Sequence, residues 1–170
     1  MHGSFPVIAA RIRTRVLTIF SRVIPTGGSM QTLIGSPALS DFKNQRLLAA
    51  LKEENPAITG ISAYFCHFVD TAVDLDKEQT HQLEQLLTYG PRMAAQEREG
   101  DLALVLPRIG TISPWSSKAT DIAHICGLTK IKRIERGIAY YLQGAEWTQA
   151  LRTLIHNRMT QITVAQLDEA

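Results

Sequence analysis

The chain has few cysteines and no long apolar run, and both absences narrow the class of protein. Its 170 residues contain only Cys66 and Cys126, too few for the disulfide framework of a small secreted domain. The apolar runs are far shorter than the roughly 20 residues that cross a bilayer. A secretory signal pattern is also missing. We therefore expect a cytoplasmic protein that does not span a membrane.

Acidic residues are absent from the start of the chain. Before Asp41 the only charged side chains are four arginines, Arg11, Arg13, Arg15 and Arg22. The whole chain has a formal net charge of +2, so residues 41–170 together carry −2. A slightly acidic domain lacks the basic face that neutralises nucleic-acid phosphates. We therefore expect no nucleic-acid partner.

Residues 1–29 differ in composition from the rest and are predicted to be a flexible basic leader. Arg11, Arg15 and Arg22 fall near one helical face, which is typical of an organelle targeting segment or a membrane-surface helix. The alternative is a start codon placed too far upstream. Since glycine and serine at 27–29 make a flexible joint, we expect residues 1–28 not to pack on the core. Residues 30–170 have the length of one domain.

Hydrophobic periodicity predicts strands and helices in strict alternation. The predicted strands cover 30–34, 58–69, 102–106 and 131–142. The predicted helices cover 36–54, a segment after Asp74 or Asp76 that carries Leu83, Leu86 and Leu87, residues 113–126, and a last segment from 146 with Trp147, Leu151, Leu154, Ile155 and Ile162 at helical spacing. Such an order fits a parallel, doubly wound sheet or an antiparallel one, and periodicity alone does not decide between them.

Two Ser-Pro pairs predict helix starts. Ser36-Pro37 and Ser113-Pro114 each place a capping hydroxyl before a residue whose φ is preset for the first helical turn. Gly127 can adopt the left-handed conformation that ends a helix. The segment 107–128 is therefore predicted to be a strand, a loop and a capped helix.

The start of this helix is the candidate interface or anion site. Its residues share hydroxyl, cationic or aromatic side chains: Arg108, Ser113, Trp115, Ser116, Ser117 and Lys118. Free backbone amides at a helix start attract phosphate, which would suit a phosphate-binding enzyme, but serines there also serve as simple caps. Trp115 is either an exposed interface residue or a core anchor.

No catalytic, cofactor-binding or metal-binding residue is assigned. A Ser-x-x-Lys nucleophile pair fails because Trp115 stands three residues before Lys118. Cys66 and His67 are neighbours on a predicted strand and should point to opposite faces, and His124 and Cys126 diverge on a helix. We expect buried thiols and hydrogen-bonded histidines rather than a zinc site.

Five blocks of the sequence resemble a known family. They are 30–42, 64–70, 83–91, 107–128 and 135–141. Together they resemble, in order and approximate spacing, the N-terminal domain of the large, single-chain phosphoribosylformylglycinamidine synthase. The resemblance covers about residues 30–168. One position departs from it, because Ile125 stands where the family is expected to carry asparagine.

The resemblance implies an α+β fold. It implies a mostly antiparallel sheet of about four or more strands with four helices on one face, similar to two fused copies of the family's small subunit. It also implies a chain truncated before the linker, synthetase and glutaminase domains, which would be the partners of this one.

The family is an ATP-dependent carbon–nitrogen ligase of purine biosynthesis with glutamine as amido donor. The resemblance implies that ATP, magnesium and the glutaminase triad belong to the absent domains, so no cofactor and no catalytic residue is transferred to this chain. A structural or coupling domain, inactive by itself, is expected. The alternative is a free-standing module that assembles with separate synthetase and glutaminase chains.

Overall fold

Within residues 29–89, 99–108 and 110–164, which the computed structural model describes, five strands form a single antiparallel sheet. The strands are β1 (Ser29–Pro37), β2 (Gly60–Thr71), β3 (Asp101–Pro107), β4 (Ile131–Gln143) and β5 (Gln161–Val164), in the spatial order β1-β2-β4-β3-β5. All four strand pairs are antiparallel. The predicted α+β class with an antiparallel sheet is therefore confirmed.

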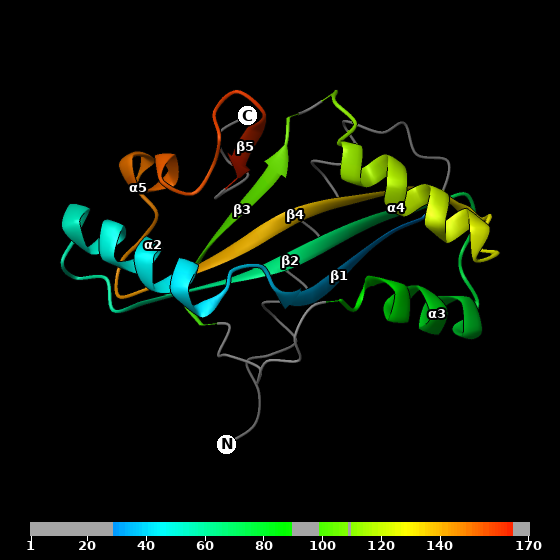
Figure 1. Cartoon of the computed structure of the whole chain (residues 1–170), viewed down its shortest axis with the longest axis horizontal. Coiled ribbons are helices and arrows are strands. Elements are labelled where there is room, and N and C mark those ends of the chain that lie inside the picture. The colour runs from blue at the N-terminus through cyan, green and yellow to red at the C-terminus, as the bar shows by residue number, and fades with distance from the viewer. Residues whose placement is uncertain (1–28, 90–98, 109, 165–170) are drawn as a thin grey trace, which may run out of the picture.

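Four helices of the described residues pack on one face of this sheet. They are α2 (Asp41–Glu54), α3 (Lys77–Leu87), α4 (Pro114–Ile125) and α5 (Gln149–Thr153). Figure 1 shows α2 and α5 at one end of the long strands and α3 and α4 at the other. Each pair covers its own cluster of buried apolar side chains, the first around Leu51, Leu142 and Leu151 and the second around Leu83 and Ala123.

The opposite face of the sheet is also apolar. Side chains alternate between faces along a strand, so Tyr64, Cys66 and Phe68 of β2 point away from the helices. They form a third buried cluster with Leu104 of β3 and Tyr141 of β4. This cluster contains no residue of a described helix, which leaves all four of these helices on one side, as predicted.

Helix α4 protects an edge of the sheet. Strand β3 pairs with β4 only as far as Val105 and Ile138, so the first half of β4 has no strand on that side. There the hydroxyl of Ser116 donates to the Ile134 carbonyl at 2.6 Å, and the Ile134 N–H donates to the Thr120 hydroxyl at 3.0 Å. Side chains of α4 thus occupy backbone groups that an exposed edge would offer to another chain.

The start of α4 confirms the predicted cap, whereas the start of α2 does not. The Ser113 hydroxyl accepts from the Ser116 N–H, and Pro114 is the first helical residue. Gly127, with φ of +88°, follows the helix end as predicted. The predicted helix start at Ser36-Pro37 is wrong, since β1 continues through Pro37 and Ser40 caps α2 instead.

The predicted C-terminal helix is present but much shorter than expected. Helix α5 has only five residues, and Ile162 lies in β5, paired with Leu106 of β3. Trp147 precedes the helix, and its backbone N–H donates to the Asp101 carboxylate at 2.9 Å. The free edge of β3 gives the last strand a hydrogen-bonding partner, and this gain outweighs the helical spacing of the apolar residues.

The predicted leader lies outside the described residues except for Ser29, which begins β1. Its packing stays a prediction. None of the helices in the described ranges has the length and apolarity needed to cross a bilayer.

Candidate functional site

An arginine is clamped between two aromatic rings in the middle of the helical face. The guanidinium carbon of Arg136 on β4 lies 4.4 Å from the ring centroid of Phe65 on β2 and 4.6 Å from that of Trp115 on α4. Both distances are within the range of cation–π attraction. Contacts with two rings restrict the movement of the guanidinium group.

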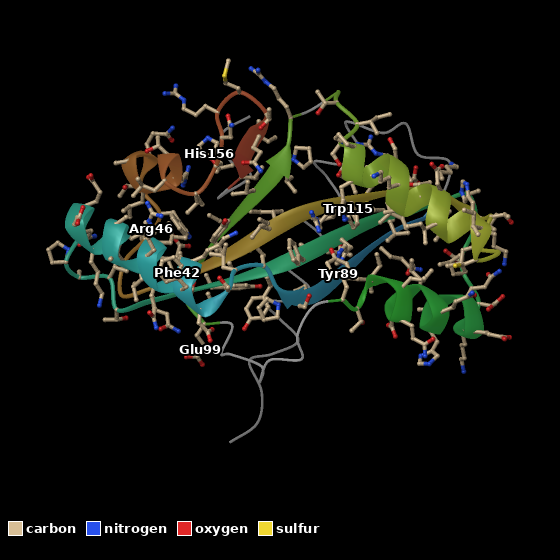
Figure 2. All side chains as sticks on the ribbon, in the orientation of Figure 1. Phe42, Arg46, Tyr89, Glu99, Trp115 and His156 are labelled. Atoms are coloured by element: carbon tan, nitrogen blue, oxygen red, sulfur yellow. The ribbon has the colours of Figure 1, made fainter. Side chains whose placement is uncertain are left out.

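Tyr89 links this arginine to a buried histidine. Its hydroxyl oxygen accepts from Arg136 Nη1 at 3.1 Å and lies 2.8 Å from His67 Nε2. The residue lies two positions after α3, and Ser36 of β1 donates to its carbonyl. Figure 2 shows the labelled Tyr89 between α2 and α3 and the labelled Trp115 at the start of α4, both over the middle of the sheet.

His67 is a neutral member of the cluster. Burial and, second, the charge of Arg136 lower its pKa from 6.5 to about 4. A neutral imidazole has one nitrogen that accepts, so in the tautomer with the proton on Nδ1 the Tyr89 hydroxyl donates to His67 Nε2. Gly35 permits β1 to pass closely over the ring, because an added Cβ there would lie 2.8 Å from His67 Cε1.

The side chain of Glu135, a residue of β4, contacts the start of α4. Glu135 precedes Arg136 on the strand and therefore points to the opposite face. Its Oε1 accepts from the Ser113 hydroxyl at 2.7 Å, and its Oε2 accepts from Arg133 Nη2 at 2.7 Å. The carboxylate is almost fully buried. A negative charge is favourable at a helix N-terminus, and here the protein supplies one of its own.

The structure separates the six residues of the candidate anion site. Ser113 and Ser116 are engaged, the first with Glu135 and the second, which is buried, with the Ile134 carbonyl. Arg108 is exposed and donates from Nη1 to the Met159 carbonyl at 3.4 Å. Ser117 and Lys118 are exposed on α4. Binding of an anion by this segment stays a prediction.

Of the two alternatives for Trp115, the structure supports packing on the core, and an interface role stays a prediction. Trp115 is half-buried and packs against the α3–α4 apolar cluster. Its ring also lies 5.6 Å from the His67 ring, centroid to centroid, in addition to covering Arg136. One side of the indole therefore belongs to the core, and the residue also forms part of the candidate site.

The sequence reasoning missed Phe65, His67, Tyr89 and Arg136 as a site. The available signal was a single arginine between Ile134 and Ile138 on the inward side of a predicted strand. Each of the four missed residues also lies in one of the blocks that carry the family resemblance.

The two cysteine–histidine pairs, Cys66 with His67 and His124 with Cys126, take part in packing and hydrogen bonding. Cys66 lies in the apolar cluster on the face away from the helices, and His67 lies on the helical face, as the strand alternation predicts. His124 Nε2 is 2.6 Å from the Ile131 carbonyl oxygen. Within the described ranges, no three His, Cys, Asp or Glu side chains gather closely enough to hold a metal ion.

A protein-family model matches more than half of the chain. Its description is formylglycinamide ribonucleotide amidotransferase N-terminal, and the match covers residues 64–170. The matched range includes the residues around Arg136, together with the start of α4. The residues around Arg136 are Phe65, His67, Tyr89 and Trp115.

Proposed function

This chain belongs to the family of formylglycinamide ribonucleotide amidotransferase N-terminal domains, and on that premise we propose that it is the non-catalytic structural and coupling domain of the amidotransferase. The complete enzyme would be an ATP-dependent ligase of purine biosynthesis, acting in the cytoplasm. It would transfer glutamine-derived ammonia to formylglycinamide ribonucleotide.

The observation that carries this proposal is how the polar side chains are used. The Glu135 carboxylate is paired with Arg133 and Ser113, and the Ser116 hydroxyl is bonded to backbone. The His67 imidazole is buried against Tyr89 and has its pKa lowered to about 4. These groups hold the sheet, helices and loops together, which favours a role carried by surfaces over one carried by reactive side chains.

The partners in this role are the synthetase and glutaminase parts of the enzyme, in the same chain or as separate subunits. ATP and magnesium would bind in the synthetase part, as the family resemblance implies. This domain would pack on both parts and help to align or seal the path of ammonia between them.

A mixing experiment tests the proposal. The 170-residue chain is added to a synthetase–glutaminase polypeptide that lacks its N-terminal domain, and glutamine-dependent formylglycinamidine formation is measured. We expect the chain alone to be inactive, and its addition to raise glutamine-dependent synthesis per glutamine hydrolysed. Turnover by the chain alone, or no change on addition, would contradict the proposal.

A further inference from the structure

We propose that Arg136 is a docking receptor for a carboxylate, an Asp or Glu side chain presented by the protein surface that covers the middle of the helical face. The inference rests on the proposed function, since that surface belongs to the rest of the amidotransferase. It goes further by naming the residue that the partner engages and the chemistry of the engaging group.

The guanidinium of Arg136 is restrained by its neighbours, and its donors are only partly used. A guanidinium carries five N–H donors in a planar fork. Among the described residues, the side chain of Arg136 makes one hydrogen bond, from Nη1 to the Tyr89 hydroxyl. The rings of Phe65 and Trp115 hold it in place. Little side-chain entropy therefore remains to be lost when a carboxylate binds.

The charge of Arg136 has no counter-charge among the described residues. The ion pairs there are Lys130 with Asp76 and Arg133 with Glu135. Glu135 is next in sequence but points to the other face and is already paired. The titratable groups beside it on the same face are Tyr89, whose hydroxyl accepts from Arg136, and His67, which is neutral at physiological pH. A half-buried cation surrounded by neutral groups gains most from an incoming anion.

The surroundings favour a protein as the carrier of that anion. Arginine, tryptophan and tyrosine are the residues most enriched where binding energy concentrates in protein interfaces. Helix α4, which supplies Trp115, also exposes Ile122 by 53% and Ile125 by 85%, and Ile112 just before the helix is 66% exposed. Ile122 is seven residues after Trp115 and therefore on nearly the same face of α4, so a partner that covers Trp115 and Arg136 can also cover Ile122, which a small anion would leave in water.

Binding measurements with charge variants test the inference. The 170-residue chain is titrated with the truncated synthetase–glutaminase polypeptide, and the dissociation constant is measured by calorimetry. We expect Arg136→Gln to weaken binding at least tenfold. Arg136→Lys should fall between it and the wild type, because lysine keeps the charge but lacks the planar fork.

Arg46→Gln is the matched control. Arg46 is an exposed arginine on α2, on the same side of the sheet (Figure 2), and its loss removes the same charge. We expect the dissociation constant of this variant to stay within twofold of the wild type. Added salt should weaken the wild-type complex more steeply than the Arg136→Gln complex, because the ion pair is present only in the former.

The outcomes separate this inference from the proposed function. No complex with the wild-type chain would reject both. A wild-type complex that Arg136→Gln forms equally well would reject the carboxylate receptor alone. If Arg136→Gln does not fold, as judged by circular dichroism, the folded Arg136→Lys variant decides, and unchanged affinity overturns the inference. Submillimolar binding of inorganic phosphate that depends on Arg136 would also overturn it, in favour of a small-anion site.

Discussion

The end of the sheet under α2 and α5 is held mainly by apolar packing, with separate side-chain hydrogen bonds such as Asn44 Nδ2 to the Ile61 carbonyl at 3.0 Å, whereas the end under α3 and α4 adds a connected network of them. The first cluster contains eleven buried residues, the second seven. The difference follows the strands. Where β3 pairs with β4, the strand satisfies that edge of β4, but where β3 diverges, the Ser116 and Thr120 hydroxyls of α4 take its place. Polar residues near the site are therefore partly a consequence of sheet geometry.

Two leucine truncations should give the largest effects and test the comparison directly. Leu51 on α2 and Leu83 on α3 are both fully buried. Each change to alanine should lower the free energy of unfolding by about 2–5 kcal/mol. Leu51→Ala should cost more, because its cluster of buried residues is larger. Urea denaturation measures both, and a greater loss in Leu83→Ala would break the comparison.

The stability of the protein should depend on pH because of the buried His67 near the α3–α4 end of the sheet. The pKa of His67 is about 4 in the folded protein against an ordinary value of 6.5, so the unfolded chain binds more protons between these values. Stability should therefore fall as the pH falls from 6.5 towards 4, by about 2 kcal/mol between pH 7 and pH 5. Burial raises the pKa of Asp70, which opposes part of this loss at the acidic end.

His67→Gln isolates the histidine contribution. The variant lacks the titrating ring, so its unfolding free energy should change less between pH 7 and pH 5 than that of the wild type. Urea titrations at the two pH values measure the difference. Equal pH dependence in the two proteins would show that His67 is not a source of acid sensitivity.

Replacing Ser116 should lower the free energy of unfolding by less than the pH effect of His67 but by more than replacing the neighbouring Ser117. Replacement of Ser116 by alanine leaves the buried Ile134 carbonyl without the hydroxyl donor, a loss of about 1.5 kcal/mol. Ser117→Ala, on the exposed side of the same helix, should change stability by less than about 0.5 kcal/mol. Thermal unfolding of the pair checks this, and equal effects would remove the edge-protecting role of α4.

Replacing the helix caps should lower stability less than replacing Ser116. Asp76 and Gln79 form a reciprocal capping box on α3, whereas Ser40 caps α2 through one bond of 3.4 Å. Asp76→Ala should cost about 1 kcal/mol and Ser40→Ala about half of that. Chemical denaturation resolves the two. A larger loss at Ser40 would show that the α2 end depends on its cap more than on its packing.

Local signals predicted the elements that short-range physics controls. The cap at Ser113 and the long strands at 58–69 and 131–142 were predicted close to their observed bounds. The same Ser-Pro signal failed at Ser36, since that segment is still paired with β2. The prediction that Ile162 belongs to a helix failed for a similar reason, because its strand partner Leu106 is far away in the sequence. Pairing between distant segments overrode local pattern in both cases.

The candidate site was less predictable than the fold. Trp115 was identified because it lies beside a recognisable cap. Arg136 was not, since its environment comes from β2, from the residues after α3 and from α4, and no local pattern reports that these converge. The antiparallel arrangement itself was taken from the family resemblance, because periodicity alone left the strand direction open.

Glu135 and Arg136, adjacent residues of opposite charge at the centre of β4, also help to set the register in which β4 pairs with β2. Glu135 belongs on the face with Arg133 and Ser113, and Arg136 on the face with the aromatic clamp. A slip of β4 by one position would send the arginine into the apolar cluster of Phe68 and Cys66 and leave the carboxylate among aromatic rings. Both misplacements would be costly, so this dipeptide disfavours the nearest wrong pairing of the two longest strands.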